Sequence, residues 1–150
     1  MTDYFQSNFP RQSVAVTNSL LRTTPIDADD ASGKIALTVA EAGSERKAGD
    51  ILMLKVADVS YLADYFVMMT GYSKVQVRAI ASAIEEKVET DCNRRPLRVE
   101  GKTEATWVLL DYGEVIVHIM LPKEREFYNL EAFWGHAERV ELPISVDSGG

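Results

Sequence analysis

The run YFVMMT at residues 65–70 constrains the fold of this chain more than any other part of its sequence. It is apolar at every position through Met69, and a strand with apolar side chains on both sides is covered on both faces of its sheet. Gly71 interrupts the run, and Ser73 and Gln76 have the spacing of a capping box, in which each side chain bonds a free backbone N–H at a helix start. We therefore predict a strand, a helix cap and an amphipathic helix in that order, which is typical of a βα unit.

Apolar residues at helical spacing predict two more helices. The first begins at Ser32 and stops at Gly49. The second begins at Pro122, where a missing N–H costs nothing, and ends at Gly135. One face of the first helix carries Ile35, Val39, Ala42 and Arg46, and the apolar stripe of the second comprises Phe127, Leu130 and Trp134.

The remaining patterns predict strands at residues 51–56 and 97–99 and a hairpin at residues 107–120. The whole is expected to form one domain at residues 32–142, between flexible tails at residues 1–31 and 143–150.

The charge balance argues against a nucleic-acid binder. The chain has 16 Lys and Arg residues against 23 Asp and Glu residues, a net charge of −7, whereas nucleic-acid binders present a basic face to phosphates. Its one basic cluster, RRPLR at residues 94–98, is expected to be a solvated turn. We expect little direct nucleic-acid binding and favour a basic protein as partner.

Other features indicate a soluble protein of a reducing compartment. No apolar run approaches the length of about eighteen residues that suggests a membrane span, and the N-terminal segment lacks signal-peptide character. A single cysteine, Cys92, forms neither an internal disulfide nor a metal cluster. We predict a cytoplasmic protein with no cofactor and no metal site.

The segment WVLLDYGEVIVHIM, which begins at Trp107, places three polar residues among apolar ones: Asp111, Glu114 and His118. If YG is a two-residue hairpin loop with Gly113 at positive φ, strand alternation puts all three on the sheet face of Trp107. The opposite face is then almost entirely apolar, and on it Leu110 pairs with Val115, Val108 with Val117, and Thr106 with Ile119.

Three interpretations of the polar face stay open from these residues alone. His118 can be a hydrogen-bonded interior group beneath a covering helix. Asp111 and His118 can be a base and its orienting group, although no third catalytic member is identifiable. The face can also contact a partner, with Trp107 and Met120 as an apolar centre beside the carboxylates, and this interpretation is slightly favoured.

From about Ser32 through Leu142 the chain resembles the Iojap family, the ribosomal silencing factors (RsfS). The first thirty residues and the last eight fall outside the resemblance. The motifs that carry it, in matching order and spacing, are DYFVMMTG at 64–71, Ser73, Gln76, RAI at 78–80, RVEG at 98–101, WVLLDYGEVIVH at 107–118 and REFYNLEAFWG at 125–135.

The resemblance implies both a fold and a function. Family members have a mixed five-stranded α/β sheet flanked by helices, with a topology related to nucleotidyltransferases but without their catalytic motif. They bind the large ribosomal subunit at its subunit-joining face, through its basic protein number fourteen. There they sterically block the small subunit and so repress translation. They also take part in large-subunit maturation, and many are homodimers.

By position in the family motif, the partner-binding residues are Trp107, Leu110, Asp111 and Tyr112. Trp107 is expected to be an apolar anchor, and Asp111 a charge that sets the register of a basic partner. The hairpin register places Leu110 on the core face, so the contact is expected to involve the strand end and the turn. His118 is expected to be a structural residue opposite Trp107.

Two other classes of function remain as alternatives. A nucleotidyltransferase-like enzyme needs a Gly-Ser element and then paired carboxylates for Mg²⁺. Gly71 and Ser73 imitate the first part, but no Asp-x-Asp follows on a strand, so we predict no catalytic residue. A dimeric scaffold that does not bind ribosomes would share every bulk feature. For this chain we expect a homodimer, to which exposed aromatics such as Tyr128 or Trp134 contribute. The acidic residues that follow the Gly-Ser element, all expected on a helix, are Glu85, Glu86, Glu89 and Asp91.

Overall fold

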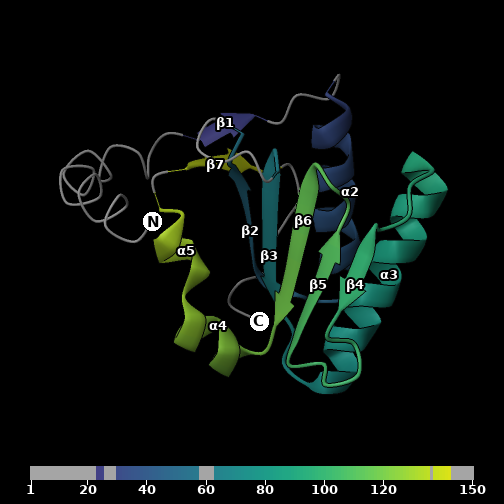
Figure 1. Ribbon diagram of the computed structural model, residues 1–150, viewed down its shortest axis with the longest axis vertical. Coiled ribbons are helices and arrows are strands. Elements are labelled where there is room, and N and C mark those ends of the chain that lie inside the picture. The colour runs from purple at the N-terminus through teal and green to yellow at the C-terminus, as the bar shows by residue number, and fades with distance from the viewer. Residues whose placement is uncertain (1–22, 26–29, 58–62, 136, 143–150) are drawn as a thin grey trace.

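A seven-stranded mixed sheet with the strand order β1-β7-β2-β3-β6-β5-β4 forms the centre of the protein (Figure 1). The computed structural model describes residues 23–25, 30–57, 63–135 and 137–142. The strands are β1 (Thr23–Pro25), β2 (Gly49–Lys55), β3 (Tyr65–Thr70), β4 (Arg98–Glu100), β5 (Trp107–Asp111), β6 (Val115–Met120) and β7 (Glu138–Glu141). The helices are α2 (Ala31–Glu45), α3 (Lys74–Cys92), α4 (Pro122–Tyr128) and α5 (Leu130–Phe133).

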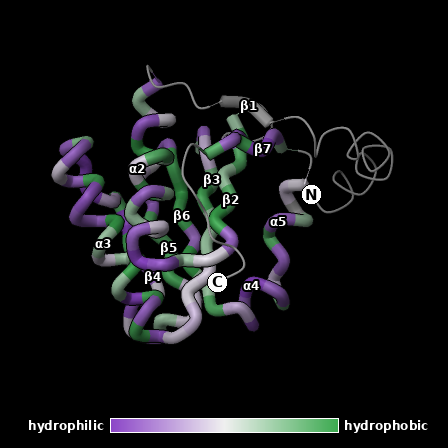
Figure 2. The backbone as a smooth tube through the Cα atoms, turned by 180° about the vertical axis from the view of Figure 1, so that it is seen from behind, coloured by the Kyte–Doolittle hydropathy of each residue, from purple (hydrophilic) through white to green (hydrophobic). Residues whose placement is uncertain are grey.

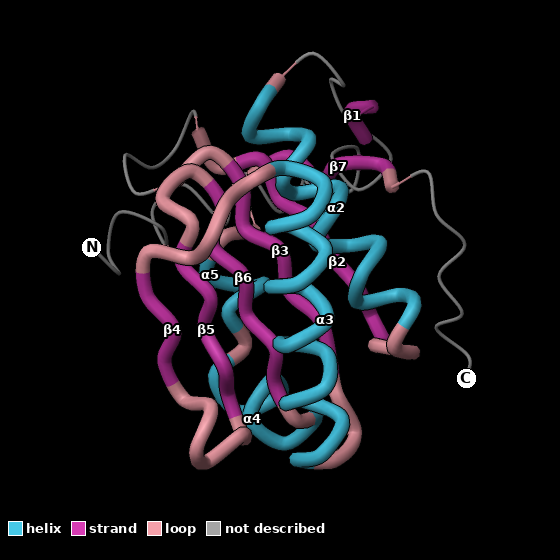
Figure 3. The backbone as a smooth tube through the Cα atoms, turned by 90° about the vertical axis from the view of Figure 1, so that its right-hand side faces the viewer, coloured by secondary structure: helices cyan, strands magenta, loops and turns pink. Residues whose placement is uncertain are grey.

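Helices cover both faces of the sheet. Figure 3 shows α2 and α3 on one side of the strands and α4 and α5 on the other. The larger core lies under α2 and α3, and a smaller one lies under α5. Because β3 contributes alternate residues to both cores, all six of its residues are buried. The prediction from YFVMMT is therefore confirmed.

Hydrophobic residues concentrate along the central strands, whereas α4 is mostly hydrophilic (Figure 2). In the part of the chain that the structure describes, no helix combines the length and the apolar character needed to cross a membrane.

The mixed α/β sheet flanked by helices is confirmed, but the number of strands was wrong. The five predicted strands are present, and β1 and β7 extend the sheet beyond β2. They pair with each other in parallel, Thr23 with Arg139 and Pro25 with Glu141. The segment 23–25 therefore belongs to the fold although it was predicted to lie in a flexible tail. The rest of that tail before residue 30, and the predicted tail at 143–150, fall outside the described residues.

The ends of the predicted helices also needed correction. Asp30 caps α2, since its Oδ1 accepts the N–H of Ser32 at 3.1 Å, so the helix begins at Ala31. Ser73 caps α3 as predicted, accepting the N–H of Gln76 at 3.0 Å, but Gln76 accepts the N–H of Tyr72 rather than that of the cap residue.

The predicted last helix is two short helices that meet at a bend. Asn129 takes the left-handed conformation (φ 46°), which ends α4 and redirects the chain into α5. As a result Leu130 and Trp134 pack against the smaller core, whereas Phe127 is 78% exposed. The single apolar stripe predicted for these three residues was therefore wrong.

The hairpin of β5 and β6 has a longer loop than predicted. Asp111 pairs with Ile116 and Leu110 with Val117, so the register is shifted by two residues from the predicted one. A shift by an even number of residues leaves every side chain on its predicted face. The larger core accordingly contains Val108, Leu110, Val115, Val117 and Ile119, while Trp107 and His118 lie on the opposite face, where Trp107 contacts Tyr128 of α4.

Candidate partner-binding site

Trp107 lies at the start of β5, half-buried between a histidine and a tyrosine. Its indole Nε1–H donates to Nδ1 of His118 at 3.0 Å, and the two ring centroids are 5.9 Å apart. On the other side the ring of Tyr128, from α4, lies 4.8 Å away in a tilted arrangement. The next two elements along the chain, β6 and α4, therefore hold the indole in place, which favours a single orientation of its ring.

His118 is a buried, neutral member of this cluster. It is 8% exposed, and burial lowers its pKa to about 4. Its Nδ1 accepts a hydrogen bond and so carries no proton in the neutral ring. Phe66 meets its ring edge-on at 5.9 Å. The interpretation of His118 as a hydrogen-bonded interior group fits this geometry. Its strand partner is Leu109, however, and Trp107 is its diagonal neighbour rather than the residue opposite.

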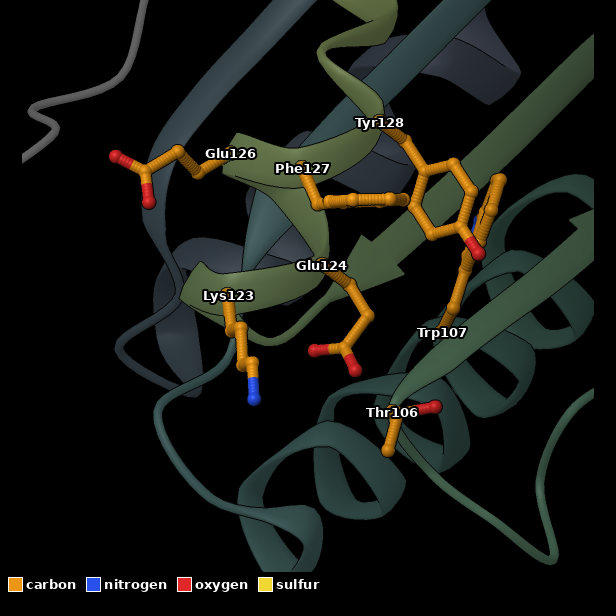
Figure 4. Close-up of a pocket in the computed structure, with 7 residues that line it drawn as sticks. All are labelled: Thr106, Trp107, Lys123, Glu124, Glu126, Phe127 and Tyr128. Atoms are coloured by element: carbon orange, nitrogen blue, oxygen red, sulfur yellow. The ribbon is translucent and has the colours of Figure 1, made fainter.

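A groove opens beside Trp107, between the start of β5 and α4 (Figure 4). It has a volume of about 590 Å³. Aromatic rings and carboxylates share its walls, and in Figure 4 the ring of Tyr128 stands between Phe127 and Trp107. Phe127 and Tyr128 are 78% and 51% exposed, which is unusual for large apolar side chains and typical of contact surfaces. The lining residues are Thr106, Trp107, Lys123, Glu124, Glu126, Phe127 and Tyr128.

Arg125 bonds α4 to the sheet and so fixes the position of the groove wall that α4 forms. Its guanidinium donates to Oγ1 of Thr70 in β3 at 2.9 Å and to Oε2 of Glu131 in α5 at 3.1 Å. Only 10% of the Arg125 side chain is exposed. Because buried charge-assisted bonds are strong, this one side chain holds both short helices against the strands.

Asp111, at the far end of β5, has a local structural role. Its Oδ1 accepts the N–H of Gly113 at 2.8 Å, and its Oδ2 lies 3.7 Å from a guanidinium nitrogen of Arg98. One oxygen therefore stabilises the turn, while 20% of the side chain remains exposed. Asp111 lies on the same sheet face as Trp107, at the opposite end of the strand.

The third polar residue of the hairpin, Glu114, forms a bidentate pair with Arg94. The two bonds are 2.8 and 2.9 Å long, and Arg94 also donates to the backbone oxygen of Tyr112 at 2.7 Å. This guanidinium lowers the pKa of Glu114. In the same basic cluster Arg95 pairs with Glu89 at 2.9 Å. Positive charge in the segment 94–98 is therefore largely matched by carboxylates.

The structure does not expose two of the four predicted partner-binding residues. Leu110 and Tyr112 are both 0% exposed and belong to the larger core. Burial raises the pKa of the Tyr112 phenol, and its hydroxyl has no hydrogen-bond partner among the described residues. Both residues pack in the core beneath the hairpin and have no exposed surface that a partner could contact. Of the four residues predicted to contact a partner, Trp107 and Asp111 are therefore the two that remain candidates.

Although Tyr128 was expected to be exposed, the groove that α4 forms with the start of β5 was not identified from the sequence. The alternation of charged and aromatic residues in KEREFY, at residues 123–128, was the available signal. No group of three or more His, Cys, Asp or Glu side chains that could hold a metal ion occurs among the described residues. The four acidic residues that follow Ser73 lie on α3, as predicted.

Residues 29–148 match the family model described as ribosomal silencing factor during starvation. The chain is 40% identical over 124 residues to "Protein Iojap, chloroplastic" of Zea mays, covering 81% of this chain and 53% of that protein. It is 39% identical over 108 residues to "Ribosomal silencing factor RsfS" of Bacillus subtilis, covering 72% of this chain and 91% of that protein.

The chain thus spans about half the length of the chloroplast relatives and most of the bacterial one. Among solved structures, an X-ray structure of a Chromobacterium violaceum protein superposes with a TM-score of 0.66 at 30% identity. The match covers 78% of this chain and 97% of that protein.

Proposed function

We propose a function from one premise: this chain belongs to the ribosomal silencing factor family. On that premise it binds the large ribosomal subunit at the face where the small subunit docks, through the basic large-subunit protein number fourteen. The bound protein then blocks subunit joining sterically and so represses translation. The proposal includes a role in large-subunit maturation, the second role that the family resemblance implies, and it involves no catalytic step.

The observation that carries the proposal is the groove beside Trp107. A partly exposed indole, flanked by exposed aromatic residues, has the character of an interface hot spot. Glu124 and Glu126 on the same groove suit cationic side chains of a basic partner. The net charge of −7 favours association with a basic protein over association with bare RNA.

The decisive experiment is sedimentation of separated ribosomal subunits under joining conditions, with increasing amounts of the protein. Wild type should keep the subunits apart and should co-sediment with the large one. Trp107→Ala should weaken this binding by about 2 kcal/mol or more, roughly thirtyfold in affinity, because the indole is the largest apolar side chain of the groove.

Circular dichroism and urea unfolding must first show that the Trp107→Ala protein is folded. Val75→Ala is the matched control, since Val75 is 74% exposed on α3, away from the groove. It should bind as wild type does. The proposal fails if wild type leaves subunit joining untouched. If the folded Trp107→Ala protein binds the large subunit as tightly as wild type does, the contact lies outside this groove.

A further inference from the structure

We propose that His118 is a positioning residue for the contact surface: its Nδ1 fixes the indole of Trp107 in the orientation that the partner meets. The inference rests on the proposed function and adds to it a buried residue that the partner does not touch. Three observations carry it, namely the 3.0 Å hydrogen bond from the indole, the burial of His118, and the place of Trp107 on the groove wall.

The hydrogen bond determines which way the indole faces. A half-buried tryptophan at the start of a strand has several rotamers available, and the Nε1–H marks one edge of its ring. Here that edge points at the buried imidazole, so the opposite edge and one ring face are turned to Tyr128 and the groove. Any rotation of the indole would leave an acceptor unpaired beneath it, which is costly in an apolar environment.

His118 is itself held rigidly. It lies in β6 between β3 and β5, where its strand neighbours are Met68 and Leu109. Phe66 packs edge-on against its ring, and Phe66 is in turn packed against Trp134 at 5.0 Å. These neighbours are all apolar, so the ring stays neutral and its Nδ1 stays an acceptor. The N–H edge of the indole is therefore oriented by the sheet, while Tyr128 of α4 packs against its ring.

Fixing the indole before binding should increase affinity. A side chain that is ordered only in the complex loses rotamer freedom on binding, and this loss weakens the association. An indole that is already ordered loses little. Without the acceptor, Trp107 would keep its apolar area but would have to be ordered by the partner. Loss of the hydrogen bond to His118 should therefore lower the affinity of the folded protein for its partner as well as its stability.

The test compares His118→Leu, which removes the acceptor, with His118→Asn, which keeps an acceptor atom bonded to Cγ. We expect His118→Leu to weaken large-subunit binding about fivefold, the equivalent of one hydrogen bond. His118→Asn should restore most of the loss. All affinities are compared at a temperature where urea unfolding shows each variant to be folded. In ¹H–¹⁵N spectra the indole N–H resonance of Trp107, assigned by its loss in Trp107→Phe, should move in His118→Leu and return toward its wild-type position in His118→Asn.

A double-mutant cycle completes the test. Trp107→Phe removes the donor but keeps an aromatic ring, so adding His118→Leu to it should weaken binding no further. If folded His118→Leu binds large subunits as tightly as wild type, His118 has only a structural role and the inference is overturned while the proposed function stands. If wild type itself does not co-sediment with large subunits, the proposed function fails and the inference fails with it.

Discussion

At the scale of single residues, each of the three polar side chains predicted to share one face of the hairpin has a partner close by. Asp111 bonds the turn, Glu114 pairs with Arg94, and His118 accepts the indole of Trp107. A buried polar group costs little when such a partner is supplied, which is how an apolar sheet contains all three. Their chemistry is that of structural groups, and His118 bonds Trp107 on the wall of the aromatic groove.

The titration of His118 gives a prediction about stability. Its pKa is about 4 in the folded protein against 6.5 for an ordinary histidine, so between these values the unfolded chain binds the proton more readily. Its contribution to folding is therefore complete above about pH 6.5 and is lost as the pH falls toward 4. The loss should reach about 3 kcal/mol at most, from the linkage between pKa and stability.

Urea unfolding measured from pH 7.5 to pH 4 would detect this loss. His118→Asn is the control, because it retains an acceptor without a titrating ring, and subtracting its pH profile removes the contribution of the carboxylates. A difference that stays flat across this range would contradict the prediction.

At the scale of elements, the parts that sequence patterns predicted are those with local periodicity. β3 follows from YFVMMT, and α3 follows from its cap and its apolar spacing. β1 and β7 have only three and four residues, and their partners are far away in the sequence, since β1 pairs with β7 and β7 also pairs with β2. Patterns among neighbouring residues do not predict pairing between such distant segments. The bend between α4 and α5 did leave a signal, since Asn129 is a residue type that tolerates the left-handed conformation.

The candidate site was predictable in part for similar reasons. Strand alternation places Trp107 and Asp111 on one face and Leu110 on the other, whatever the loop length. Tyr112 follows the last residue of β5, so alternation does not decide its side, and its burial depends on how the longer loop folds back. The groove requires α4 to lie against the sheet, and this position depends on the tertiary contacts of Arg125.

The anchoring of α4 and α5 gives a prediction for Arg125. Arg125→Met should lower the free energy of unfolding by about 2 kcal/mol, because it removes two hydrogen bonds of a charged, nearly buried group. Arg78→Met is the control. Arg78 also donates two bonds, to the backbone oxygens of Lys102 and Thr103, but it is exposed, so its loss should cost under about 1 kcal/mol. Urea unfolding of both variants decides the matter, and equal costs would show that Arg125 is not the anchor.

Two glycines that flank short strands provide a second matched pair. Gly101 (φ +89°) follows β4 and Gly113 (φ +91°) lies in the β5–β6 loop, so alanine is strained at both, by about 1 kcal/mol or more. A Cβ on Gly101 would also meet the backbone carbonyl of Trp107, whereas one on Gly113 would meet only the side chain of Leu97, at 3.3 Å. Thermal unfolding should show Gly101→Ala to be the more damaging, by at least about twofold in free energy. The reverse order would be evidence against the described path of the β4–β5 connection.

At the scale of the whole molecule, we propose a homodimer in solution. Phe127 and Tyr128 offer exposed aromatic area on α4, whereas Trp134 is partly covered by Phe66. If the dimer uses α4, Phe127→Glu should shift light scattering at tens of micromolar (a range set by ordinary dimer affinities) toward the monomer. Val75→Glu, on α3, should not. A wild-type monomer at these concentrations would contradict the proposal. A Phe127→Glu protein that remains a dimer would place the contact elsewhere.

The parallel pairing of β1 with β7 has a consequence for the order of events during synthesis. Thr23 leaves the ribosome early, but its partner Arg139 is among the last described residues to be made. β1 therefore has no partner strand until β7 has been translated. Contacts between distant segments close slowly, because the intervening chain must first be ordered. We expect the sheet to grow from its centre outward, with β3 and β6 pairing early and the β1 edge joining after β7 has formed.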